Sequence, residues 1–131
     1  MNLLLDTHIF LWALLEPNRL SLNVKSELEN SSNELWLSPL TTWEVLMLSE
    51  KGKITLSPDP LSWIRQAYKH IPFQEARLNH EVAIQSRQLS LSHKDPVDRF
   101  LCATALTYDL TLVTADTRLL ESQEYATLSN S

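Results

Sequence analysis

The sequence predicts an α/β fold with a mostly parallel central sheet of about four or five strands and helices on both faces. Short apolar runs of strand length alternate with longer segments that carry helix caps, and this alternation is typical of parallel sheets. The chain has 131 residues, of which 44% are hydrophobic and 21% charged, as expected for one globular domain. We therefore expect a single domain over residues 1–131.

The first half of the chain predicts two strands, each followed by helix. A run of leucines ends at Asp6, and the apolar segment after it stops before Pro17, which indicates a strand and then a helix. Ser21 is a suitable N-cap for a second, more exposed helix. Ser38 is the N-cap of a helix that Gly52 closes. The expected elements are strand 3–5, helices 9–15 and 21–31, strand 35–37 and helix 39–51.

The second half continues the alternation. Pro58 and Pro60 fall where the first turn of a helix accepts proline, and Asp95 with Pro96 marks another helix start. Asp116 follows a β-rich run and begins a short helix. The expected elements are helix 58–68, strand 71–73, helices 79–89 and 95–108, strand 110–114, helix 116–120 and strand 125–128. The last four residues are expected to fray.

Composition excludes several classes of function. The single glycine, Gly52, is incompatible with the glycine-rich loops that bring backbone amides to dinucleotides or nucleoside triphosphates. The formal net charge is −5, whereas non-specific nucleic-acid binders are usually basic. A lone cysteine, Cys102, excludes an internal disulfide and a thiolate metal cluster. The sequence shows neither a basic leader nor a membrane-spanning run, so we expect a cytoplasmic protein that is not bound to membrane.

Two carboxylates directly follow predicted strands. Ligands of open α/β sheets bind beyond the carboxyl ends of the strands, and Asp6 and Asp116 both lie there. Each also precedes a helix, where aspartate is a preferred N-cap. Position alone therefore leaves a capping role and a chemical role open for both.

Glu44 is predicted to lie on the apolar face of its helix. At 100° per residue it shares an arc with Leu40, Trp43 and Met47, and a carboxylate in such a stripe needs a cation or strong donors. The alternative is that Glu44 lies at the edge of the arc or pairs with Lys51, which points the same way.

Asp98 also faces apolar residues, because on its helix it lies between Leu101, Cys102 and Ala105. The alternative is structural, since Asp95 can cap this helix and an acid three residues later meets the positive end of its dipole.

Four converging carboxylates would repel one another and be poorly solvated. A divalent cation resolves this, and an all-oxygen donor set without cysteine suits Mg²⁺ or Mn²⁺. Such ions commonly act on phosphodiesters.

Four segments of the chain resemble the PIN-domain ribonucleases, and more closely the VapC-type toxins of type II toxin–antitoxin systems. They are residues 3–8, 38–47, 93–99 and 112–116. They occur in the family's order, and the four acids of that family fall on Asp6, Glu44, Asp98 and Asp116. The resemblance implies a PIN-like three-layer α/β/α sandwich and a Mg²⁺- or Mn²⁺-dependent endoribonuclease that uses a metal-activated water. It also implies RNA as substrate, a homodimer, and inhibition by a small cognate antitoxin protein.

Further residues near the four acids are candidates for supporting roles. Thr7 and Thr114 occupy positions where family members often carry a hydroxyl that binds water or phosphate, although a β-branched residue also suits a strand end. Asp95 matches the family pattern but is explained as an N-cap. Arg99 is a candidate to hold a phosphate or to brace a carboxylate.

Several other polar residues are more economically explained without catalysis. The two histidines nearest the motifs, His8 and His93, are better explained by packing and hydrogen bonding than by proton transfer. The remaining candidates for contacts with the RNA backbone are mostly expected to be solvated surface charges; they are Lys51, Lys53, Lys94 and Arg118.

Two other classes of function stay open at this point. A catalytically silent PIN-fold module would bind RNA or a protein without cutting. A phosphotransfer enzyme would use Asp6 as nucleophile, but that requires a second acid close to Asp6 or a lysine after a strand, and residues 1–12 contain one carboxylate.

Overall fold

The computed structural model describes residues 1–91 and 94–131. The strands are β1 (Asn2–Leu5), β2 (Glu34–Leu37), β3 (Gln74–Glu75), β4 (Thr111–Thr114) and β5 (Ala126–Ser129). The α-helices are α1 (Thr7–Leu15), α2 (Leu22–Glu29), α3 (Pro39–Glu50), α4 (Pro60–His70), α5 (His80–Gln88), α6 (Pro96–Tyr108) and α7 (Thr117–Leu120), and a 3₁₀ turn, η1, covers Pro17–Arg19.

The strands form one five-stranded sheet in the order β3-β2-β1-β4-β5. Every neighbouring pair is parallel, with Leu3 opposite Leu35 on one side and Thr111 on the other. The predicted α/β class and the strand number are confirmed. Because all strands run the same way, their carboxyl ends meet at one edge, and β1 ends in the middle of it.

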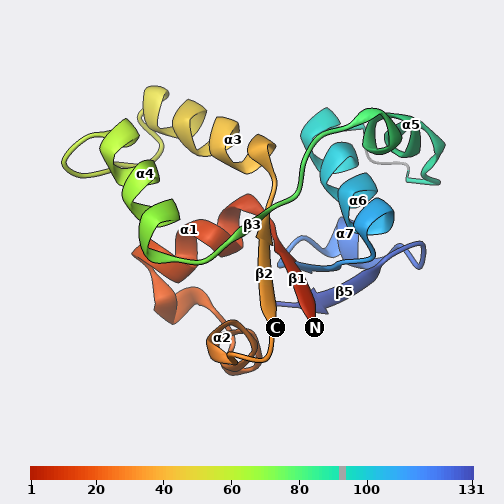
Figure 1. Cartoon of the computed structure of the whole chain (residues 1–131), viewed down its shortest axis with the longest axis horizontal. Helices are drawn as coiled ribbons and strands as arrows, with labels where there is room; N and C mark the ends of the chain where they lie inside the picture. Colours follow the sequence, from red (N-terminus) through yellow and green to blue (C-terminus); the bar gives the residue numbers. More distant parts are fainter. Residues whose placement is uncertain (92–93) are drawn as a thin grey trace.

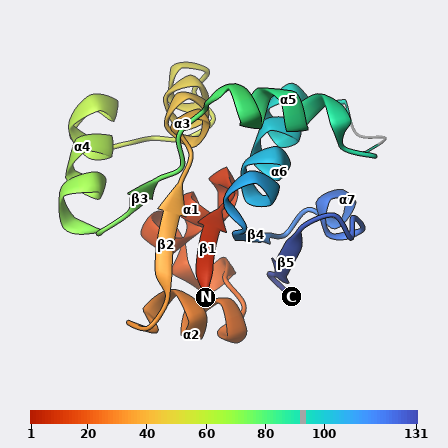
Figure 2. The ribbon, with the colours of Figure 1, turned by 45° about the vertical axis from the view of Figure 1, so that its right-hand side comes forward.

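Two helical layers enclose the sheet. In Figures 1 and 2, α3 and α4 lie on one side of β1 and β2, while α5, α6 and α7 lie on the other. Side chains of β1 alternate accordingly: Leu3 and Leu5 join a cluster that includes residues of α1 to α4, and Leu4 joins one that includes α5, α6 and α7. Because successive side chains of a strand point to opposite faces of the sheet, β1 contributes to a separate core cluster on each face.

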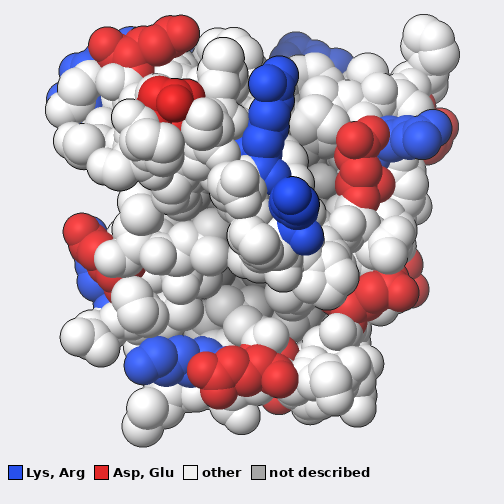
Figure 3. All heavy atoms as spheres, turned by 60° about the vertical axis from the view of Figure 1, so that its left-hand side comes forward, with Lys and Arg blue, Asp and Glu red and all other residues white. Residues whose placement is uncertain are grey.

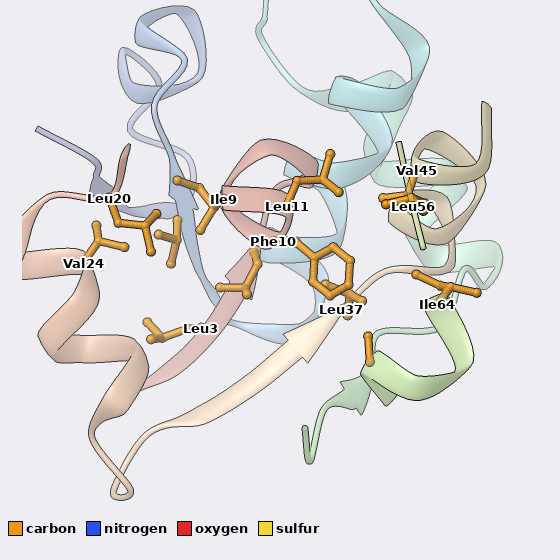
Figure 4. Packing of buried hydrophobic residues seen from close by; sticks show 13 residues of the cluster. Leu3, Ile9, Phe10, Leu11, Leu20, Val24, Leu37, Val45, Leu56 and Ile64 are labelled. Carbon is orange, nitrogen blue, oxygen red and sulfur yellow. The ribbon is translucent and has the colours of Figure 1, made fainter. Parts of the chain in front are cut away.

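The first cluster centres on α1. Figure 4 shows Phe10 pointing toward Leu37 at the end of β2, and its ring also contacts Phe73 with centroids 5.6 Å apart. Phe10 and Ile9 are completely buried. This packing fixes the first turn of α1, which carries Asp6 at its N-cap.

The surface carries charges of both signs. On the face shown in Figure 3, lysine and arginine alternate with aspartate and glutamate across largely uncharged areas. The helices within residues 1–91 and 94–131 lack the length and apolar character needed to cross a membrane.

Two local predictions are wrong. The strand expected at residues 71–73 is displaced to β3, because Phe73 donates its N–H to the carbonyl of Ile71 in a tight turn and gives its side chain to the core. The C-terminal residues are not frayed: Asn130 accepts the Ser21 N–H at 2.6 Å and donates to the Arg19 carbonyl at 3.0 Å.

Candidate functional site

A cavity of about 550 Å³ opens at the carboxyl edge of the sheet. All four predicted carboxylates line it, and each comes from a different segment of the chain. The acids are Asp6 after β1, Glu44 in α3, Asp98 in α6 and Asp116 after β4. The remaining lining residues are Thr7, His8, Trp12, Arg19, Asp95, Leu101, Ala115, Arg118 and Leu119.

Asp6 is the most deeply placed acid and is 9% exposed. Its Oδ1 accepts the Ile9 N–H at 2.9 Å and so caps α1, and its Oδ2 accepts a short hydrogen bond from the Thr114 hydroxyl. Burial raises the pKa of Asp6, while Thr114, Ile9 and the neighbouring His8 oppose that rise. The capping and chemical explanations are therefore compatible, because one carboxylate caps the helix and still lines the cavity.

Thr114 connects the two acids that follow strands. It is completely buried at the end of β4, and its oxygen accepts the Asp116 N–H at 3.0 Å while its hydroxyl donates to Asp6. A β-branched residue that only suited the strand would not need this hydroxyl. Thr114 therefore fixes the position of Asp6 relative to the start of α7.

Asp116 is already engaged by a cation. It caps α7 by accepting the Arg118 N–H at 2.9 Å, and the Arg118 guanidinium contacts both of its oxygens, Nε to Oδ1 at 3.1 Å and NH2 to Oδ2 at 2.9 Å. The Arg118 side chain is 61% exposed and that of Asp116 is 26% exposed. Arg118 is thus a positive group placed at the rim of an acidic cavity.

Glu44 lines the cavity, but the apolar face predicted for its helix is wrong. Trp43 is 54% exposed, and the buried residues of α3 are Thr41 and Val45. The apolar residues of α3 are spread around the helix and do not form one stripe, so a helical wheel based on its largest side chains selects the wrong side. Glu44 is half-buried, and within the described residues it forms no ion pair with Lys51.

Asp98 is half-buried and is the third residue of α6. Asp95 is the N-cap, with its Oδ1 accepting the N–H groups of Val97 at 2.9 Å and Asp98 at 3.2 Å. The cap is therefore provided by Asp95, as the sequence predicted. The side chain of Asp98 lies at the cavity.

The acids are close enough to act on one another. Besides burial, the charge of Asp98 raises the pKa of Asp6. Burial raises the pKa of the Cys102 thiol to about 12, and the charges of Asp98 and Asp116 add to that rise. The pKa of Arg118 is raised by Asp116 first and then by Asp98 and Asp95. The cavity is a region of negative potential that favours cations.

The donor set fits a hard divalent cation. The four predicted acids, the N-cap Asp95 and Thr7 all line the cavity, and Mg²⁺ and Mn²⁺ prefer the oxygen ligands that such side chains carry. Within residues 1–91 and 94–131, however, no three His, Cys, Asp or Glu side chains are gathered tightly enough to form a finished metal centre. The residue types thus match the chemistry of the ion.

The Arg99 side chain binds backbone carbonyls at the end of α5. Its guanidinium donates to the carbonyls of Ser86 at 3.0 Å, Leu91 at 2.8 Å and Leu89 at 3.0 Å, at the end of α5. Arg99 is not among the lining residues of the cavity, and its role toward a phosphate or a site carboxylate stays a prediction. His93 lies outside the described residues.

Two lining residues were missed by the sequence analysis. Trp12 lies on α1, and the Arg19 guanidinium carbon stands 4.3 Å from the centroid of its ring. The spacing of four residues between His8 and Trp12 places them on one face of α1, and this was the available signal. Nothing in the sequence showed that η1 would return Arg19 to that face.

The sequence matches known proteins over most of its length. Residues 3–124 match the family model of the PIN domain. The chain is 34% identical over 119 residues to "Ribonuclease VapC22" of Mycobacterium tuberculosis (strain ATCC 25618 / H37Rv), covering 90% of this chain and 89% of that protein.

Solved structures show the same fold. A DNA-bound VapBC from Salmonella typhimurium matches with a TM-score of 0.72 and 18% identity, covering 100% of this chain and 99% of the other. A toxin–antitoxin complex from Klebsiella pneumoniae gives 0.71 and 20%, covering 98% and 97%. The chain therefore belongs to the PIN-domain family and resembles its VapC-type members.

Proposed function

We propose that this protein is a Mg²⁺- or Mn²⁺-dependent endoribonuclease that cleaves phosphodiesters in single-stranded or looped RNA. The observation that carries the proposal is the meeting of Asp6, Glu44, Asp98 and Asp116 at one cavity. Its relative in Mycobacterium tuberculosis is named a ribonuclease, which supports the same activity here. An unstacked strand is the expected substrate because its backbone can enter a cavity that a duplex cannot.

The charge of the cavity supports the metal requirement. Five carboxylates, Asp95 included, line the cavity with only two guanidiniums, those of Arg19 and Arg118. This excess of negative charge repels a phosphate, and a bound cation would let a phosphodiester come closer to the acids. Asp6, Glu44, Asp98 and Asp116 would hold the ion or ions. When bound, these supply activation of water and stabilisation of the charge that develops on the phosphate oxygens.

The residues of the chain contribute position and charge. Thr114 and the N-terminus of α1 hold Asp6 in one orientation, so its carboxylate is preorganised. Arg118 balances Asp116 and lies where its guanidinium can bind a phosphate oxygen once a cation replaces it on Asp116. His8, at the mouth of the cavity, is placed to contact the substrate.

Replacement of Asp98 tests the proposal. Asp98→Asn should lower kcat on single-stranded RNA by about 100-fold or more, since loss of a charged ligand should exceed the 10- to 100-fold typical of an outer-shell change. The matched control is Asp109→Asn at the other end of α6, where the left-handed backbone (φ 55°) accepts asparagine. A chelator should stop the wild type.

Two results would contradict the proposal. Cleavage by Asp98→Asn at the rate of the wild type would exclude the site. RNA that binds to the wild type and stays intact with Mg²⁺ or Mn²⁺ would instead favour the non-cutting PIN-fold module.

We further propose that the protein is the toxin of a type II toxin–antitoxin pair, acts in the cytoplasm and forms a homodimer. The structural neighbours are toxin–antitoxin complexes, and an acidic cavity suits an antitoxin that inserts an Arg or Lys. The large apolar side chain of Trp43 is exposed on α3, which supports a second copy as partner. Induction should arrest growth in the wild type and not in Asp6→Ala, and Trp43→Asp should shift the protein to a monomer in size-exclusion chromatography.

A further inference from the structure

A second cavity continues outward from the acidic one. It has a volume of about 330 Å³, within the range of sites that hold small ligands. The two cavities share His8, Trp12 and Arg19. Lys53 and Glu16 line only the outer one. We call the outer cavity the α1 groove, since α1 and η1 supply most of its lining.

Trp12 and Arg19 form a stacked pair at the junction of the two cavities. The guanidinium carbon of Arg19 lies 4.3 Å from the centroid of the Trp12 ring. Glu16 contacts the Arg19 NH1 at 3.3 Å, and both of these side chains are 58% exposed. The His8 ring lies 5.8 Å from Trp12 at 53°. Indole, guanidinium and imidazole thus gather at one place, and the Arg19 side chain remains open to solvent.

This arrangement suits a nucleobase more than a phosphate. The edge of the guanidinium is directed to the Glu16 carboxylate, which would repel a phosphate at that point. Its planar face stays suited to stacking, and bases of single-stranded RNA stack on aromatic rings and on Arg guanidinium planes. Lys53, exposed on the far side of the groove, provides a charge for the backbone.

The groove lies close enough to the four carboxylates to bind a neighbouring nucleotide of the same strand. Trp12 follows Asp6 by six residues along α1, or ~9 Å of helix at ~1.5 Å per residue. If one phosphate of an RNA strand lies among the four acids, the base of a neighbouring nucleotide can reach Trp12.

We propose that the α1 groove is an RNA subsite in which one nucleobase beside the cleavage position stacks on the Arg19 guanidinium, with Trp12 beneath it and Lys53 near the backbone. The inference rests on the proposed nuclease function, since the same strand would occupy both cavities. It adds a binding subsite that accepts a stacked base of any identity and distinguishes bases only by how strongly they stack.

The test is binding of a short fluorescein-labelled single-stranded RNA to the full chain in a chelator, which removes cleavage. A series of oligomers, each with one abasic nucleotide, locates the stacked base. For the wild type, one abasic position should weaken binding by about tenfold, the ratio expected for loss of ~1.4 kcal/mol of base stacking. In Arg19→Lys, which keeps the charge and loses the plane, the intact RNA should bind about tenfold more weakly and the abasic position should have no further effect.

Two more variants complete the design. Trp12→Phe keeps a ring that packs in the core and should lose part of the same affinity, and Arg87→Lys, an exposed position on α5, should change nothing. With Mg²⁺ or Mn²⁺, Arg19→Lys should raise KM and leave kcat unchanged.

The outcomes separate the two proposals. An abasic effect that is equal in wild type and Arg19→Lys, or absent at every position, would overturn the subsite while Asp98→Asn still reports on the nuclease. Site-specific stacking without any metal-dependent cleavage would keep the subsite and reject the nuclease. Unchanged RNA binding in Arg19→Lys together with a weakened antitoxin complex would show that the groove binds protein instead.

Discussion

Replacing Thr114 by valine should disturb both stability and metal binding, because its hydroxyl joins Asp6 to Asp116. The variant keeps the shape of the side chain and removes the donor to Asp6 and the acceptor for the Asp116 N–H. A hydrogen bond to a charged group contributes about 1.5–3 kcal/mol, and valine recovers part of that by its apolar methyl group. We therefore expect a loss of about 2 kcal/mol.

Thermal and chemical unfolding of the metal-free protein measure this loss. For a chain of this length, 2 kcal/mol corresponds to a decrease in Tm of roughly 8 °C. The affinity for Mn²⁺, measured by titration calorimetry, should fall about 10- to 100-fold, as for other groups that orient a metal ligand.

The loss of stability in Thr114→Val should depend on pH through the pKa of Asp6. The Thr114 hydroxyl lowers the pKa of Asp6 against the larger effect of burial, so the variant should raise that pKa further. A raised carboxyl pKa means that stability present at low pH is lost as pH rises through the folded-state value. The difference between variant and wild type should therefore be largest near neutral pH and shrink toward pH 3.8, the ordinary value of the group.

Thr107→Val is the matched control. Its hydroxyl is buried and, among the described residues, has no hydrogen-bond partner, so the same chemical change should leave stability unchanged or raise it. Equal losses in the two variants, or a Thr114→Val loss independent of pH, would refute the role assigned to the Thr114 hydroxyl.

Three further predictions concern the same region. Asp6→Asn should remove cleavage yet stabilise the metal-free protein at neutral pH by about 1 kcal/mol in urea unfolding, because asparagine still caps α1 and the cost of ionising a buried carboxyl is gone; a less stable variant would contradict the burial argument. Arg118→Gln should tighten Mn²⁺ binding several-fold in calorimetry, since the ion no longer competes with a guanidinium for Asp116, and unchanged affinity would show that the pair opens at no cost. Gly52→Ala should lower stability by about 1 kcal/mol, from its φ of +72° alone, since an added Cβ meets no atom within 4 Å; thermal unfolding would expose a larger, steric effect.

The strands and the acids after them could be predicted because their signals are local. A short apolar run stops at Asp6, and a β-rich run stops just before Asp116, so the parallel sheet alone brings these ends together. Asp98 could be predicted from equally local signals. Asp95 marks the start of its helix, and the residues next to Asp98 on that helix, such as Leu101, are apolar. These predictions needed no knowledge of distant contacts.

The predictions that were wrong depend on partners far away in the sequence. Asn130 is ordered by groups 109 and 111 residues earlier, and no pattern at the C-terminus indicates them. Phe73 ends the apolar run 71–73 because it packs on Phe10, and a local pattern cannot distinguish such a core contact from a strand. Arg19 reaches Trp12 only because η1 turns the chain back.

The single glycine of the chain, Gly52, lies at the C-terminal end of α3. Gly52 ends α3 in a Schellman motif, in which its N–H bonds to the Ser49 carbonyl and the Lys53 N–H bonds to that of Leu48. This turn sets Lys53 at the α1 groove. Loops rich in glycine bind phosphate through backbone amides, whereas here the one glycine orients a side chain. If the RNA strand lies as we propose, this chain handles the phosphates on both sides of the cleavage position with side chains and a cation, and its acidic net charge follows from the site itself.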